Sequence, residues 1–201
     1  MYKRKVFERY FKLDEERQLF RCIAQYQDIH ARRDLAWMRL ARHTGVRVCV
    51  LVGLTVLDAQ QALRDGALHI RGAINKRNKE YSVPVNKVAR AALKELLALR
   101  REMGHGNAED TPLIMSRNHK GMSERSFQAR MAYWCGVAKL PLDASPHWLR
   151  HTLAKRIMQQ STAQDPRAIV QQVLAHDDIE TTMIYTLPDR EDIARTMDEV
   201  A

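Results

Sequence analysis

The sequence predicts a mostly helical fold with one small antiparallel sheet near its middle. Apolar residues recur at helical spacing over most of the 201 residues, and short β-prone segments occur only between residues 54 and 85. Residues that favour helix caps stand before several of the periodic segments. The composition, with 45% hydrophobic and 28% charged residues, is typical of a globular protein with a sizeable core.

The elements are predicted in order along the chain. The first helix runs from a cap at Asp14 to about Gln27, and the second covers 33–43 and stops at Gly45. Further helices are predicted at 47–53, 87–103, 123–137, 147–159, 166–174, 179–185 and 189–200. Strands are predicted at 54–57, 67–71 and 81–85, with a hairpin tip at 77–80 and a linker-like loop at 104–111.

The charge balance points to a class of partner. Lys and Arg outnumber Asp and Glu by 33 to 24, which gives a net charge of +9. Such a surplus favours a polyanion such as nucleic acid, although charge alone leaves a membrane surface as an alternative. The N-terminus lacks the apolar segment of a signal peptide, and the longest uncharged apolar run, 48–57, is about half a membrane span. We therefore expect a soluble, cytoplasmic protein.

The cysteines and histidines suggest neither a disulfide framework nor a metal site. Cys22, Cys49 and Cys135 are odd in number and lie among apolar neighbours, which favours buried, reduced thiols. No Cys-x-x-Cys pair occurs, and the eight histidines do not cluster with cysteine. We expect no metal and no cofactor.

A polar cluster at 146–153 is the most informative stretch for chemistry. On a helix, His147, Arg150 and His151 share one face, since they are spaced by three and four residues. Arginine offers a bidentate fork to phosphate, histidine can move protons near neutral pH, and a helix N-terminus favours an anion. Taken alone, the pattern also fits a solvated start of a helix.

A tyrosine follows the next segment that contains a histidine, 174–178. Tyr185 comes nine residues after His176. A phenol with a pKa of about 10 needs a base and nearby positive charge before it can act as a nucleophile. Beside Met183 and Ile184 such a tyrosine is, on its own, more often a core residue.

Four segments in this order resemble the tyrosine recombinases, also called phage-type integrases. They are 44–48, which resembles the Gly-x-Arg box with Arg47; 76–84, which resembles the β-hairpin with the active-site lysine; 146–152, which resembles the His-x-x-Arg-His box; and 174–185, which resembles the Leu-Gly-His segment and its tyrosine. Each box is weak by itself, but the order and spacing match from residue 45 to residue 185. The resemblance implies the catalytic-domain fold of that family.

The resemblance also implies roles for individual residues. Tyr185 would attack a DNA phosphodiester, form a 3′-phosphotyrosyl link and release a 5′-hydroxyl. Arg47 and Arg150 would clamp the scissile phosphate. His147 would accept the Tyr185 proton. If Tyr185 were not the nucleophile, Tyr81 and Tyr133 would be the next candidates.

Three further residues complete the implied site. His176 would donate a hydrogen bond to a phosphate oxygen, and His151 would support Arg150. Lys76 would protonate the departing 5′ oxygen, with Lys79 as the alternative. Two departures stand out: Val50 occupies the position where the family commonly has a glutamate that braces the first arginine, and Ala175 replaces the glycine of the Leu-Gly-His segment.

The resemblance implies site-specific recombination of double-stranded DNA, whether by integration, excision or inversion. The covalent link would store the bond energy, so the reaction would need neither ATP nor a metal. The implied assembly is a tetramer on DNA, with room for accessory DNA-bending factors and no membrane partner. Two alternatives stay open: a type IB topoisomerase-like enzyme that nicks and reseals one strand, and a non-catalytic DNA-binding regulator on the same scaffold.

We expect three parts: a basic N-terminal arm or linker stub at 1–12, a catalytic domain at 13–188 and a C-terminal tail helix at 189–201. Few residues precede the catalytic domain. Either a core-binding domain has been truncated, or the protein has the compact build of the fimbrial-switch invertases. The apolar face of the tail would suit docking on a neighbouring protomer, with docking on its own chain as the alternative.

Overall fold

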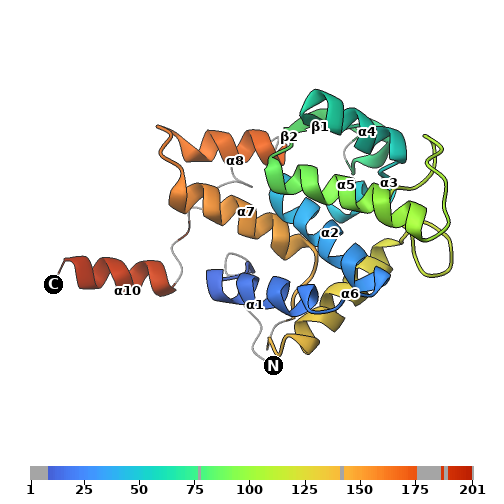
Figure 1. The fold of residues 1–201 in the computed structure, drawn as a ribbon. Helices are drawn as coiled ribbons and strands as arrows, with labels where there is room; N and C mark the ends of the chain where they lie inside the picture. The colour runs from blue at the N-terminus through green and yellow to red at the C-terminus, as the bar shows by residue number, and fades with distance from the viewer. Residues whose placement is uncertain (1–8, 77, 141–142, 176–186, 188–189, 201) are drawn as a thin grey trace.

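The computed structural model describes residues 9–76, 78–140, 143–175, 187 and 190–200 (Figure 1). Its elements are α1 (Leu13–Ala24), α2 (Ile29–Thr44), α3 (Val48–Gly53), α4 (Val56–Asp65), β1 (Ala67–Ile70), a 3-10 turn (Gly72–Ile74), β2 (Tyr81–Pro84), α5 (Lys87–Glu102), α6 (Glu124–Val137), α7 (His147–Gln160), α8 (Pro166–Leu174) and α10 (Arg190–Glu199). The described residues thus form the expected helical fold with a two-stranded antiparallel sheet.

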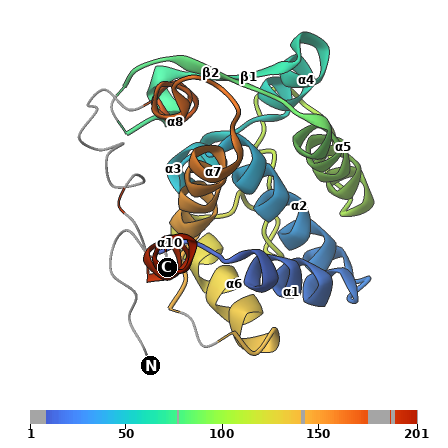
Figure 2. The same ribbon diagram turned by 90° about the vertical axis from the view of Figure 1, so that its left-hand side faces the viewer.

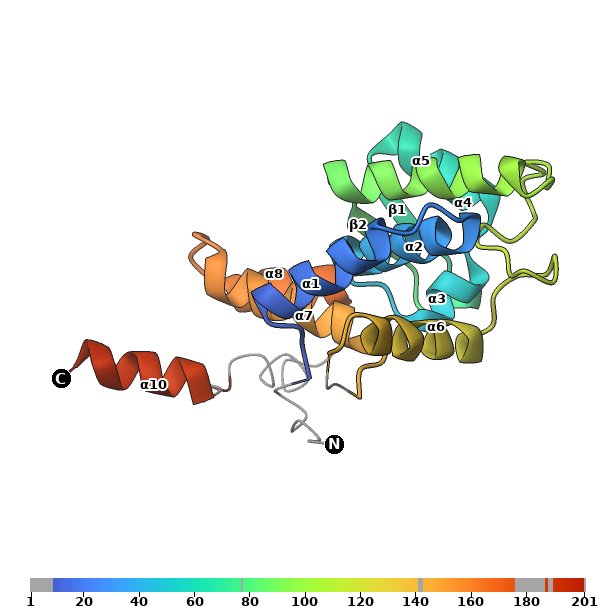
Figure 3. The same ribbon diagram turned by 60° about the horizontal axis from the view of Figure 1, so that its bottom comes forward.

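Helix α2 organises the packing. It contacts α1, α5 and α7, which surround it in Figures 1 and 3. Asp28 caps its N-terminus by accepting hydrogen bonds from the backbone N–H groups of His30 and Ala31. At the other end, Gly45 adopts the left-handed conformation, with φ at 66°, and stops the helix as predicted.

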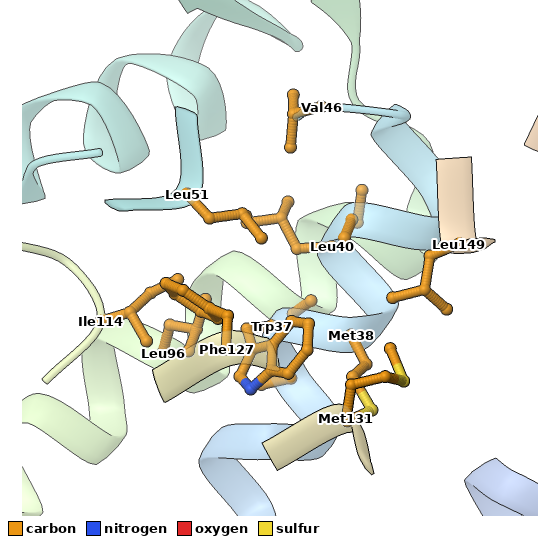
Figure 4. Packing of buried hydrophobic residues seen from close by; sticks show 14 of the residues in the cluster. Trp37, Met38, Leu40, Val46, Leu51, Leu96, Ile114, Phe127, Met131 and Leu149 are labelled. Carbon is orange, nitrogen blue, oxygen red and sulfur yellow. The ribbon is translucent and has the colours of Figure 1, made fainter. Parts of the chain in front are cut away.

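The hydrophobic core lies around the inner face of α2. Trp37 is fully buried and meets Phe127 of α6 edge-on, with 5.0 Å between the ring centroids. Figure 4 shows Leu51, Leu96 and Leu149 reaching the same cluster from α3, α5 and α7. These contacts fix α7, which carries the 146–153 cluster, against the middle of the molecule.

A buried carboxylate joins α2 to α6 beneath this core. Asp34 has no exposed surface. It accepts hydrogen bonds from the guanidinium groups of Arg33 and Arg130 and from the indole N–H groups of Trp37 and Trp134. Because two cations and two neutral donors surround it, the charge is compensated where water is absent.

The sheet is smaller than the sequence suggested. β1 and β2 pair from Ala67 with Pro84 to Ile70 with Tyr81, as predicted. The strand predicted at 54–57 is wrong, because α4 begins at Val56. Thr55 and Asp58 form a reciprocal capping box, and this local hydrogen bonding outweighs the β preference of the apolar side chains.

The N-terminal part also differs from the prediction. Lys12, rather than Asp14, is the N-cap of α1, and Asp14 lies in the first turn. Phe11 is fully buried, and its backbone N–H donates to Thr152 Oγ1 at 2.9 Å. The preceding residue, Tyr10, is also buried. The last residues of the expected arm therefore belong to the packed core, and residues 1–8 lie outside the described residues.

Most of the remaining helices follow the predicted bounds. α5, α6, α7 and α8 end within one residue of them, and Asn86 and Ser123 cap α5 and α6. α2 begins at Ile29, four residues before the predicted start. The helix predicted at 179–185 lies outside the described residues.

The three cysteines form no disulfide. Cys135 is buried, and burial followed by the charge of Glu15 raises the pKa of its thiol to about 12, whereas Cys22 and Cys49 are half-buried. No group of three or more potential metal ligands occurs among the described residues. Within the same part of the chain, no helix is long and apolar enough to cross a membrane.

Candidate active site

Two distant parts of the sequence meet where α2 ends and α7 begins. Gly45 and Arg47 lie in the connection between α2 and α3, and His147, Arg150 and His151 lie on the first turns of α7. α7 packs against both α2 and α8, and Figure 2 shows these helices next to α3 and the sheet. The structure therefore brings together the first and third segments singled out in the sequence.

Arg150 is the buried centre of this region, with 1% of its surface exposed. Its Nη1 donates to the carbonyl oxygen of Gly45 and its Nη2 to that of Leu174, both at 2.5 Å. These carbonyls lie at the C-terminal ends of α2 and α8, where backbone acceptors lack partners within the helix. The two bonds use two of the five N–H donors of a guanidinium.

Gly45 permits this close packing for two reasons. Its positive φ is a conformation that side chains with a Cβ rarely adopt. A Cβ at this position would also lie 2.6 Å from Leu174 Cδ2 and 3.0 Å from Leu153 Cδ2. A larger residue would force the side chains of Leu174 and Leu153 to move.

Arg47 supplies a second, more accessible cation. It is the N-cap of α3, its side chain is half-buried, and it forms no ion pair with any described residue. Val50, in the position of the expected bracing glutamate, is fully buried in the apolar core. Within the described part of the chain, the charge of Arg47 is therefore available to attract an anion.

His147 lies within the field of both arginines. Part of the residue is exposed to solvent, while its ring meets the ring of His151 edge-on, with 4.5 Å between the ring centroids. Desolvation, followed by the positive charges of Arg150 and Arg47, lowers the pKa of His147 to about 4. At neutral pH the imidazole is therefore uncharged and can accept a proton.

Tyr81 is the residue that sequence reasoning placed least well. The sequence predicted a strand residue and an alternative nucleophile at this position. In the structure, its hydroxyl is buried close to Arg150 and Arg47. Burial raises the pKa of this phenol, and the two arginines oppose that effect. Strand alternation was the available signal, since Tyr81 shares a face of β2 with the buried Val83.

The hairpin lysine is not joined to this group. Lys76 is exposed between the 3-10 turn and β2, and no hydrogen bond or ion pair links it to the other described site residues. Asn75 shapes the segment by donating from Nδ2 to the carbonyl oxygen of Lys79 at 2.8 Å. The structure thus gives Lys76 a place near the hairpin tip but no contact with the arginines.

Two of the expected site residues, His176 and Tyr185, lie outside the described residues. The last described residue before them is Ala175, the C-cap of α8, with φ at 47° and ψ at 53°. The left-handed conformation costs a non-glycine residue roughly 1–2 kcal/mol. This explains why a glycine suits the position and what its replacement by alanine costs.

Comparisons with known proteins place this arrangement in a family. Residues 9–191 match the phage integrase family. The tyrosine recombinase XerC of Pseudomonas aeruginosa is 38% identical over 173 residues, which are 85% of this chain and 52% of that protein. XerC of Shewanella amazonensis is 36% identical over 172 residues, covering 86% of this chain and 54% of its own length. The chain thus spans about half the length of these curated relatives.

Solved structures share the fold. A crystal structure of the XerA recombinase superposes with a TM-score of 0.76 at 23% identity, covering 94% of this chain and 64% of that one. The XerH site-specific recombinase bound to its difH substrate gives a TM-score of 0.72 at 20% identity, covering 96% of this chain and 54% of that one. The family match extends over nearly the whole chain and includes the segments with Arg47, His147 and Arg150. The chain therefore belongs to the phage integrase family, the tyrosine recombinases.

Proposed function

We propose that this chain carries the catalytic site of a site-specific DNA recombinase that cuts and rejoins strands through a 3′-phosphotyrosyl intermediate. The observation that supports it most directly is the convergence of two arginines with a histidine that is neutral at pH 7. Two guanidinium groups beside the start of a helix favour a phosphate, and the net charge of +9 suits a DNA partner.

In the proposed reaction, Arg47 and Arg150 stabilise the negative charge that builds on the non-bridging oxygens of the scissile phosphate. The phenol oxygen of Tyr185 attacks phosphorus, and the phenol proton passes to His147. The bond from phosphorus to the 5′ oxygen breaks as the new ester forms. The 5′-hydroxyl of a partner strand reverses these steps, so each phosphodiester lost is regained.

The remaining roles are proposed from the family pattern. Lys76 donates the proton that the departing 5′ oxygen needs, and its place at the end of an exposed hairpin segment suits approach to bound DNA. His176 donates to a phosphate oxygen, and His151, in ring contact with His147, supports the arrangement of the first turns of α7.

We propose that the DNA partner is double-stranded and that protomers assemble on it as a tetramer in the cytoplasm, with accessory DNA-bending factors as further partners. XerH was solved with its difH substrate and lambda integrase as a dimer on a core site, and this chain shares their fold. Helix α10 lies apart from the other helices in Figures 1 and 3. Ile193 and Met197 of this helix and Val200 just after it are 52%, 63% and 74% exposed, which suits docking on a neighbour.

Tyr185→Phe tests the nucleophile. A pool of nicked duplexes with randomised cores traps the covalent complex, because the cleaved strand diffuses away. The wild-type chain should give a denaturation-resistant protein–DNA band. Tyr185→Phe should give none, because Tyr185 is the one residue proposed to form the ester. A wild-type chain that binds DNA without this band would favour the regulator, and relaxation of a supercoiled plasmid without a selected site would favour the topoisomerase-like enzyme.

His147 should titrate far below an ordinary histidine. In the free protein, its ring resonances should show a midpoint near pH 4, because desolvation and two positive charges oppose protonation. Arg47→Gln should move the midpoint upward by removing one of those charges. Arg167→Gln is the matched control, since Arg167 is exposed at the start of α8 and is no cause of the shift. A midpoint near 6.5 would contradict the neutral proton acceptor.

Lys76→Ala should slow cleavage by about 10²–10⁴-fold if Lys76 is the general acid. Sulfur in place of the 5′ oxygen leaves as a thiolate without a proton, so the loss should largely disappear on that substrate. Lys79→Ala is the control and should cleave both duplexes at the wild-type rate. Equal slowing of Lys76→Ala on both duplexes would mean that Lys76 only binds DNA.

Docking of the tail on a neighbour can be tested by two charge substitutions, one on the apolar face of α10 and one on its polar face. Met197→Glu should weaken the complex that joins two duplexes, measured by sedimentation, and leave single-site cleavage intact, because a charge would have to be buried in the neighbour. Asp198→Lys changes an exposed position on the opposite face and should have little effect. A lower melting temperature of the Met197→Glu monomer would indicate docking on its own chain.

A further inference from the structure

The hydroxyl of Tyr81 is buried and has no hydrogen-bond partner among the residues that the structure describes. Most buried polar groups in folded proteins are paired, and an unpaired one is costly. Phenylalanine would fill nearly the same space on β2 without this cost. The fold alone therefore gives no reason for the hydroxyl, and a reason must be sought in the neighbouring site.

The neighbours of this hydroxyl are cations. Arg150 and Arg47 both favour the ionised phenol, and Arg150 approaches closely enough to act as a hydrogen-bond donor, although no bond of good geometry is formed. Cys49 is the other described group that influences the phenol, and no carboxylate of the described residues is among them. In such a field the phenol oxygen is suited to accept a hydrogen bond from a guanidinium N–H.

The guanidinium of Arg150 is itself held by the carbonyls of Gly45 and Leu174. Backbone acceptors at two helix ends thus help to set its orientation. A phosphate on the solvent side would draw the cation outward, and a further acceptor beside it would fix where its N–H groups point. Tyr81 Oη is placed to be that acceptor.

We propose that Tyr81 is a positioning residue for Arg150: when the scissile phosphate binds, the Tyr81 hydroxyl accepts a hydrogen bond from the guanidinium and fixes its direction towards the phosphate. The inference rests on the proposed recombinase function. It assigns Tyr81 no contact with DNA and no covalent role. The bond forms with the phosphate in place, and among the described residues the hydroxyl has no other partner that would compete for it.

Tyr81→Phe tests this in the full chain, with Tyr133→Phe as the matched control, because Tyr133 is 50% exposed on α6. The probe is one duplex recovered from the randomised pool by covalent capture. Tyr81→Phe should cleave it about 10- to 100-fold more slowly, the range expected for a lost hydrogen bond to a charged group. DNA affinity should be unchanged, and the melting temperature equal or higher, because no bond is lost in the free protein.

A second substrate separates positioning from a structural role. Methylphosphonate at the cleaved position removes the negative charge that Arg150 would stabilise. The penalty of Tyr81→Phe should therefore shrink towards one-fold on this duplex, whereas a distorted site would be slowed equally on both. Equal slowing, no slowing on the phosphate, or a lower melting temperature would each overturn the inference.

The same experiment keeps the two proposals apart. If Tyr185→Phe loses the covalent band and Tyr81→Phe behaves as wild type, only the positioning role fails. If Tyr81→Phe loses the band and Tyr185→Phe keeps it, Tyr81 is the nucleophile, and both proposals are wrong as stated.

Discussion

The candidate site depends on one buried cation between two helix ends. Arg150 donates to the carbonyls of Gly45 and Leu174, which carry the partial negative charge of the C-termini of α2 and α8. Backbone carbonyls rather than a carboxylate make these two contacts. They hold the guanidinium in place, and neither of them carries a full negative charge. The glycine at 45 lets the three segments approach closely enough for both bonds.

The charge of Arg150 changes the chemistry of its neighbours. It helps to lower the pKa of His147 to about 4, so that a histidine at the start of α7 is neutral where an ordinary one is partly charged. It also opposes the effect of burial on the phenol of Tyr81. Desolvation and the arginine charges together keep His147 neutral, and the same charges give the region its positive field. The proposed cleavage of a phosphodiester would use both features.

Two arginine clusters lie along α2, and their partners differ. Around Asp34, the guanidinium groups of Arg33 and Arg130 are neutralised by a carboxylate, and the cluster ties α2 to α6. At the other end of α2, the backbone carbonyls of Gly45 and Leu174 accept hydrogen bonds from Arg150. The first cluster ties two helices together, and the second places positive charge beside His147.

The sequence by itself determined most of the helices and the segments that carry the site, because caps and helical periodicity are local properties. Asn86, Ser123 and Gly45 mark helix ends in both sequence and structure. The tertiary structure decided that α4 begins at Val56, inside the predicted strand, and that Phe11 is core, since capping and long-range contacts overrode local preference. It alone brought Tyr81 to Arg150, 69 positions away in the chain, because neither periodicity nor motif spacing encodes which side chains meet across a fold.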